Sequence, residues 1–275
     1  PSPPGPPAID IVGAGGVASG SFNISTGAAL LTAAMGVRVV KHGNRSISSR
    51  SGSADLLECL GLPQPLDEKR SGECLAATGF TFLFAPHYHP AMKEIAPVRR
   101  ALGVRTVFNL LGPLTNPAEP PFGLIGAYSR DAARLMAETL AGMPIQRVFV
   151  VHGEPGWDEP TPCGPFELYD VTPGHVVRTE RDPLDCGLAR CTPQSLAGGD
   201  AARNATGMRA VFTGQDRGSH RDALVLNAAL ALEVTGTVTD PHAAIRAASD
   251  ALDRGDGARL LDRLAAFGSS IGGAS

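Results

Sequence analysis

Short runs of β-branched and aromatic residues alternate with longer stretches of helical periodicity over most of the chain. The short runs are bounded by Gly or Pro, and such runs predict buried strands better than helices. The predicted strands are Ile9–Val12, Val37–Val40, Phe80–Phe84, Leu124–Tyr128 and Val148–His152. The stretches between them that predict helices include Ser25–Met35, Ala54–Leu60, Ala91–Leu102 and Arg130–Ala141.

Strands that alternate with helices indicate an α/β fold, in which a mainly parallel sheet is flanked by helices on both faces. Two runs separated by Thr172-Pro173-Gly174, Phe166–Val171 and His175–Arg178, predict a hairpin. Beyond Ser195 the pattern is helical only. The helices predicted there are Ala201–Val211, His220–Val234, Pro241–Asp253 and Gly257–Ala266. The order of the strands does not follow from the pattern.

The proline-rich residues 1–9 are expected to be a linker or the end of a truncated domain, and residues 10–275 a single α/β domain. The 275 residues carry a net charge of −3, which argues against a polyanionic or membrane partner. No run approaches the roughly 18 apolar residues of a membrane span. The five cysteines form no CxxC pair, which favours reduced thiols and a cytoplasmic protein.

A glycine-rich loop follows the first predicted strand, as Gly13-x-Gly15-x-x-Ala18. Glycines before a helix let backbone N–H groups approach an anion. A dinucleotide site would also need an acidic residue about 20 positions later, to hold a ribose hydroxyl. The second strand leads instead into Lys41 and Arg45, which suit phosphate. A plain strand-turn-helix with two surface cations explains the glycines about equally well.

The segment that starts at Lys41 favours phosphate binding more strongly. Within fifteen residues it holds one amide, Asn44, and three cations, Lys41, Arg45 and Arg50. The same segment holds the hydroxyls of Ser46, Ser48, Ser49, Ser51 and Ser53. Hydroxyls can saturate phosphate oxygens while cations neutralise their charge. A solvated serine-rich loop is the alternative.

Together, several motifs resemble those of the anthranilate phosphoribosyltransferase family, from about Asp10 to about Phe267. They are Gly13-x-Gly-Gly16, Asn23-Ile-Ser-Thr26, Lys41-His-Gly-Asn-Arg45, Ser51-Gly-Ser-Ala-Asp55, Arg105-Thr-x-Phe-Asn-x-Leu-Gly-Pro-Leu114, Gly156-x-Asp158-Glu159, Gly198-Gly-Asp200 and Asn204-Ala205. The resemblance implies the α/β catalytic domain of nucleoside phosphorylases and phosphoribosyltransferases, without the family's N-terminal helical segment. It also implies a homodimer in the intact protein and a role in tryptophan biosynthesis.

By the same resemblance, the loops would bind phosphoribosyl pyrophosphate (PRPP). The residues implied are Gly13, Gly16, Val17, Ser21, Asn23, Ile24, Ser25, Thr26, Lys41, His42, Gly43, Asn44, Arg45, Ser49 and Ser53. Mg²⁺ would be held by Ser25, Asp158 and Glu159, since adjacent carboxylates are hard oxygen ligands. An ordinary exposed acidic turn is the alternative for the carboxylate pair. No catalytic acid, base or nucleophile is expected, because positioning and electrostatic stabilisation would carry the reaction.

The anthranilate side would use Gly13, Asn44, His42, His89 and Arg99. A guanidinium can fork onto the carboxylate of an aromatic acid, which a lysine does less well. Ten residues separate His89 from Arg99, so that the two could share one face of a helix. A satisfied core histidine and a solvated arginine are the alternatives for this pair.

One position departs from the family, which has Asp where this chain has Val17, and Ser21 replaces a Thr. The missing carboxylate leaves two other functions open: phosphoribosyl transfer to a different aryl acid, and a PRPP-binding relative without turnover. A pyrimidine-nucleoside phosphorylase, whose fold is similar, is a third alternative. The Asn23-Ile-Ser-Thr26 and Asn44-Arg45 motifs argue against the phosphorylase.

Overall fold

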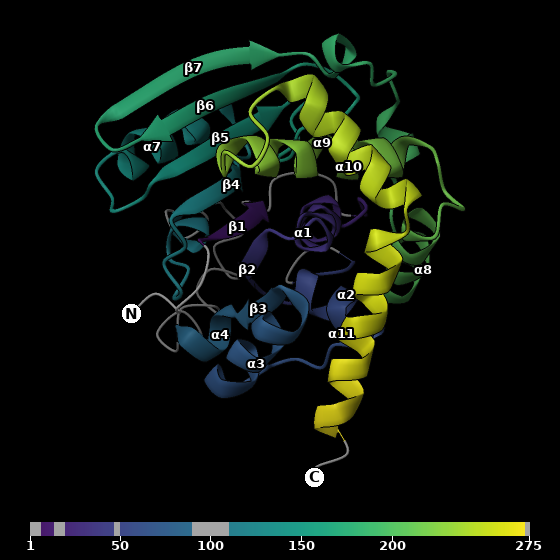
Figure 1. Cartoon of the computed structure of the whole chain (residues 1–275). Helices are drawn as coiled ribbons and strands as arrows, with labels where there is room; N and C mark the ends of the chain where they lie inside the picture. Colours follow the sequence, from purple (N-terminus) through teal and green to yellow (C-terminus); the bar gives the residue numbers. More distant parts are fainter. Residues whose placement is uncertain (1–6, 14–19, 47–49, 90–109, 273–275) are drawn as a thin grey trace.

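The structure, a computed structural model, describes residues 7–13, 20–46, 50–89 and 110–272. Within these residues, seven strands form one sheet in the order β3-β2-β1-β4-β5-β6-β7 (Figure 1). The strands are β1 (Ala8–Gly13), β2 (Arg38–Gly43), β3 (Phe80–Phe84), β4 (Phe122–Gly126), β5 (Arg147–Gly153), β6 (Phe166–Thr172) and β7 (His175–Arg181). The first five run parallel, whereas β6 and β7 are antiparallel to their neighbours.

Helices flank the sheet on both faces. They are α1 (Ile24–Ala34), α2 (Ser53–Cys59), α3 (Glu68–Thr78), α4 (Ala85–Tyr88), α7 (Arg130–Leu140), α8 (Ala201–Phe212), α9 (Ser219–Val234), α10 (Pro241–Asp253) and α11 (Asp256–Gly272). The predicted fold class, the hairpin and the helical C-terminal stretch are therefore confirmed. None of the described helices combines the length and apolar character needed to cross a membrane.

The structure differs from the prediction at two single elements. The first strand begins at Ala8, because Ala8 and Ile9 pair with Arg38 and Val39 of β2, so residues 8 and 9 belong to the sheet and not to a linker. Helix α3 was not predicted, because charged residues fill its first turn. Its boundaries are set instead by the N-cap Asp67 and by Gly79, which ends it in the left-handed conformation. The predicted helix Ala91–Leu102 lies outside the described residues.

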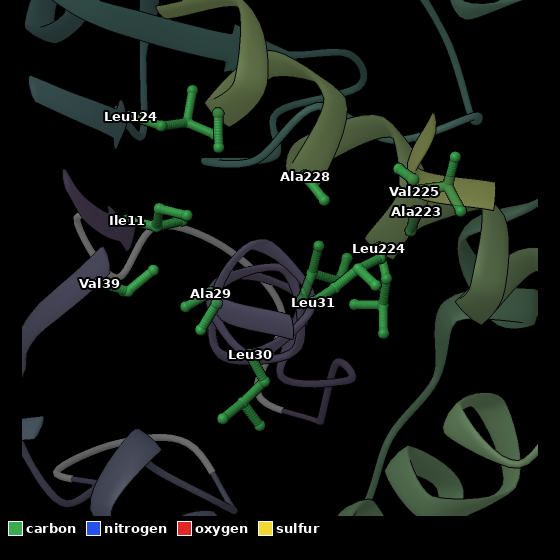
Figure 2. Packing of buried hydrophobic residues seen from close by; sticks show 14 of the residues in the cluster. Ile11, Ala29, Leu30, Leu31, Val39, Leu124, Ala223, Leu224, Val225 and Ala228 are labelled. Carbon is green, nitrogen blue, oxygen red and sulfur yellow. The ribbon is translucent and has the colours of Figure 1, made fainter. Parts of the chain in front are cut away.

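Helix α1 lies between the sheet and α9, and it is buried on nearly all sides (Figure 2). Ala29 points toward Ile11 of β1 and Val39 of β2, whereas Leu31 points toward Leu224 of α9. Because apolar contacts surround α1, its start is fixed relative to the ends of β1 and β2. The five parallel strands all end at this same edge of the sheet, and the candidate site is built there.

Candidate active site

A loop that follows β5 carries the acidic pair Asp158-Glu159 across the ends of the strands. It turns back at once, since the Gly153 amide donates to the Trp157 carbonyl (2.9 Å). A Cβ atom on Gly126, at the end of β4, would lie 1.6 Å from the Asp158 carbonyl oxygen. Glycine at that position therefore lets the acidic loop rest directly on the sheet. A Cβ atom on Gly13 would lie 2.6 Å from Oδ2 of Asp158, so the carboxylate reaches the end of β1.

The Glu159 carboxylate meets the first turn of α1, where the Ser25 amide donates to Glu159 Oε1 (3.3 Å). Burial, and next the charge of Asp158, raise the pKa of Glu159 to about 8. The predicted metal residues Ser25, Asp158 and Glu159 thus lie together, at a place where two carboxylates repel each other. Carboxylate and hydroxyl oxygens are ligands that a hard divalent cation prefers, so this set fits Mg²⁺.

The Lys41 side chain is only 1% exposed and lies close enough to the acidic loop to interact with the charges of Asp158 and Glu159. Its ammonium group donates to the Ile11 carbonyl. Burial lowers the pKa of Lys41, and the charges of Asp10, Glu159 and Asp158 oppose that shift. The ammonium group therefore counters buried carboxylates, which the sequence did not show. Its predicted contact with phosphate stays a prediction.

Asp10 is a buried acid within β1, and its carboxylate connects three segments. It accepts from the His42 amide (3.2 Å) and from Nδ2 of Asn116 (2.8 Å), which also donates to the Val40 carbonyl (2.8 Å). Burial raises the pKa of Asp10 to about 6, although Lys41 opposes this. Sequence reasoning passed over Asp10 and Asn116. A charged residue in the middle of an apolar strand was the available signal.

The two predicted phosphate-binding loops form one cradle. Nδ2 of Asn23 donates to the Ser51 carbonyl (3.2 Å), and Oγ of Ser51 donates to Oδ1 of Asn23 (3.1 Å). Oγ1 of Thr26 donates to Oγ of Ser53 (3.0 Å). These bonds join residues 27 or 28 positions apart, so the start of α1 and the start of α2 are held as one unit. Ile24 is fully buried in the core, so the structure places it beneath the cradle's surface instead of in contact with a ligand.

Arg45 faces α2 instead of adding an unpaired cation to this cradle. Its guanidinium pairs with Asp55 (3.0 Å) and with Glu58. Oδ2 of Asp55 in turn accepts from the amides of Ser46 and Gly52 (3.0 Å each). Arg45 therefore shapes the loop after β2, where the neighbouring Asn44 also bonds the Arg45 amide through Oδ1 (2.7 Å).

Two histidines of the predicted acceptor side lie edge to face, with the ring centroids of His42 and His89 5.2 Å apart. Burial, and then the neighbouring His89, lower the pKa of His42 to about 4, so its ring is neutral at pH 7. Nε2 of His42 is buried and has no hydrogen-bond partner among the described residues. Nε2 of His89 bonds the Thr115 carbonyl (2.9 Å), and the resulting pair borders the end of β2.

Four predicted site residues lie outside the described part of the chain: Gly16, Val17, Ser49 and Arg99. Ser21 forms an isolated bridge with Ala197, and Gly43 ends β2 beside the cradle. Sequence reasoning also missed Asn227 of α9, whose Nδ2 donates to the Pro160 carbonyl (2.8 Å) and so holds the acidic loop. An asparagine inside an apolar helix was its only signal.

The raised pKa of Glu159 predicts a fall in stability with pH. The folded protein keeps a proton on Glu159 that the unfolded chain, with an ordinary pKa of 4.5, has lost, so the free energy of unfolding declines as pH rises from 4.5 to 8. Asp10 acts in the same direction below pH 6, and His42 in the opposite direction between pH 4 and 6.5. Of these three groups, Glu159 therefore contributes most to the pH dependence of the free energy of unfolding between pH 6.5 and 8.

We expect the Tm of the metal-free protein to fall between pH 6.5 and 8, and the Glu159→Gln variant to show a flatter profile. At pH 8 the variant should melt at least about 2 °C higher than the unmodified chain. Differential scanning calorimetry in chelator measures both. Glu138→Gln, a substitution on the exposed face of α7, is the control. Equal slopes for all three proteins would contradict the burial of a charged Glu159.

A parallel sheet with a loop cradle and a carboxylate pair at its strand ends fits the class of α/β proteins that bind ligands at that edge of the sheet. Consistent with this class, the family described as "Glycosyl transferase family, a/b domain" matches residues 5–258. An anthranilate phosphoribosyltransferase from Methylobacterium nodulans is 46% identical over 96% of this chain and 78% of its own length. The chain belongs to the anthranilate phosphoribosyltransferase family.

Solved structures agree with this assignment. The anthranilate phosphoribosyltransferase of Thermus thermophilus superposes with a TM-score of 0.88 at 43% identity, covering 96% of this chain and 78% of that one. The enzyme of Saccharomyces cerevisiae, determined in complex with PRPP and Mg, superposes with a TM-score of 0.88 at 28% identity. There the match covers 97% of this chain and 75% of the yeast chain.

Proposed function

We propose that this protein transfers the phosphoribosyl group of PRPP to the amine of anthranilate, giving N-(5-phosphoribosyl)anthranilate and diphosphate. The observation that carries the proposal is the meeting of Ser25, Asp158 and Glu159 at the glycine end of β1, next to the Asn23–Ser51 cradle. A relative at 46% identity bears the name of this activity, and a yeast relative has been determined with PRPP and Mg.

Ser25, Asp158 and Glu159 would hold Mg²⁺, which when bound neutralises charge on the diphosphate. The amine nitrogen attacks C1 of the ribose while the bond from C1 to the diphosphate oxygen breaks, and the amine loses one proton. The chain's part is to orient the two substrates. The cradle made by Asn23 and Thr26 with Ser51 and Ser53 holds PRPP, and the neutral His42 borders the acceptor.

The acceptor is selected through its carboxylate, which Arg99 would clamp in this proposal. We expect turnover with anthranilate and none with aniline, and loss of turnover in the Arg99→Ala variant. Diphosphate release in the presence of PRPP and Mg²⁺, with a panel of aryl acids, measures this. Equal rates with aniline and anthranilate would contradict the clamp. Phosphorolysis of thymidine or uridine, followed in parallel, would point instead to a nucleoside phosphorylase.

We further propose that Val17, in place of the family Asp, makes the site less dependent on a second Mg²⁺, since a carboxylate beside diphosphate is tolerable only with a cation. A cytoplasmic location and a homodimer are part of the same proposal. The five cysteines are free thiols, which supports a reducing compartment. Light scattering after gel filtration tests the dimer.

A further inference from the structure

A segment far along the sequence runs beside the turn that precedes α1. Ser21 bridges Ala197 in antiparallel fashion, the Phe22 amide donates to the Leu196 carbonyl (3.0 Å), and the Gly198 amide donates to the Gly20 carbonyl (2.6 Å). A Cβ atom on Gly198 would lie 2.5 Å from the Ser21 carbonyl oxygen. The glycine therefore allows the two backbones to approach closely, and the approach brings the start of α8 to the cradle.

Asn204, in the first part of α8, is 1% exposed and forms two side-chain hydrogen bonds at this junction. Its Oδ1 accepts from the Gly199 amide (2.7 Å), and its Nδ2 donates to Oδ1 of Asn23 (2.7 Å), 181 residues earlier. A backbone amide can only donate, so the first bond fixes which end of the Asn204 amide faces Asn23. This in turn fixes Asn23, whose Nδ2 is left to donate to the Ser51 carbonyl.

We infer that Asn204 is a positioning residue for PRPP: it sets the orientation of the Asn23 amide and thereby the shape of the cradle. The inference rests on the proposed PRPP-dependent function. A merely structural role, as part of the cap of α8, is the competing explanation. That cap already has its own residue, because the Asp200 carboxylate accepts from the Arg203 amide (2.8 Å). The bond from Asn204 to Asn23 adds nothing to α8 itself.

The Asn204→Asp variant separates the two explanations. A carboxylate keeps the acceptor for the Gly199 amide, and with it the local fold, but it places an oxygen opposite Oδ1 of Asn23. Asn204→Ala removes both bonds, and Asp200→Ala removes the cap of the same helix without touching Asn23. Calorimetric titration with PRPP and Mg²⁺ gives the affinity, steady-state kinetics the KM values, and thermal melting the stability of each variant.

We expect Asn204→Asp and Asn204→Ala to weaken PRPP binding about 10-fold. The KM for PRPP should rise with it, while the KM for anthranilate stays within about 2-fold. Asp200→Ala should lower the Tm and leave PRPP affinity within about 2-fold. If Asn204→Asp binds PRPP like the unmodified chain, or if Asp200→Ala weakens binding as much, Asn204 acts only through the helix and the inference is wrong.

A double substitution completes the test, because Asn204 is inferred to act through Asn23. In an Asn23→Ala background, Asn204→Ala should change PRPP affinity by less than about 2-fold, and a full additional 10-fold loss would refute the coupling. The unmodified protein serves as the reference for the function. If it does not bind PRPP at all, the proposed function fails, whereas normal binding by it and by every Asn204 variant overturns only the positioning role.

Discussion

The double substitution Asp158→Asn, Glu159→Gln is expected to lower kcat/KM by about 100-fold or more and to leave the fold intact. The two carboxylates lie side by side over the end of β1, and Glu159 accepts a hydrogen bond from the Ser25 amide. Without them, the proposed site loses the two charged ligands that would hold a cation against the diphosphate. Initial rates over a range of Mg²⁺ concentrations measure the loss.

A matched control distinguishes the loss of the site's two carboxylates from a change in net charge. Asp131→Asn, Glu138→Gln changes the charge by the same amount on the exposed face of α7 and should leave the rate unchanged. The site variant should also melt at a higher temperature than the unmodified chain at pH 8, since it no longer buries two repelling acids. A site variant that keeps near-normal rates at limiting Mg²⁺ would show that the acidic pair holds no catalytic metal.

The alternation of apolar runs and helical stretches was sufficient to predict the α/β class, five parallel strands and the β6–β7 hairpin. Strand order was not predictable, because the apolar pattern of Ile9–Val12 would be the same for a central strand and for an edge strand. Its central place follows from pairing with both β2 and β4, contacts between segments about 30 and 110 residues apart. Helix α3 was missed because its caps, Asp67 and Gly79, decide it more than its narrow apolar face does.

The candidate site, like the fold, was predictable from the sequence only in part. The motif resemblance grouped Ser25, Asp158 and Glu159 as one site, and the structure brings these residues together; their role as metal ligands stays a prediction. Asn204 and Asn227 instead bond the neighbouring segments, through hydrogen bonds to Asn23 and to the Pro160 carbonyl, 181 and 67 positions away. A lone asparagine in a helix carries no local trace of such a partner. Only the packing of the folded chain brings the asparagine and its partner together.

We expect Lys41→Met to destabilise the protein strongly and to weaken PRPP binding. Lys41 is the cation that the charges of Asp10, Asp158 and Glu159 all act on, and removal of one partner from a buried charge cluster costs about 3–5 kcal/mol. This corresponds to a fall in Tm of about 10 °C. PRPP affinity should drop about 10- to 100-fold, because the acids at the proposed diphosphate site lose their counter-charge.

The pH dependence of this loss separates charge from packing. At pH 5.5 the carboxyls of Asp10 and Glu159, with pKa values of about 6 and 8, are largely protonated in the folded protein, so less charge is left for Lys41 to neutralise than at pH 8. The Tm difference between Lys41→Met and the unmodified chain should therefore widen from pH 5.5 to pH 8. Adding Asp10→Asn should recover part of it, and Lys69→Met, at an 83% exposed side chain, should show none. A deficit that is constant with pH and unaffected by Asp10→Asn would mean that Lys41 fills space near the acidic loop and that its charge does not matter there.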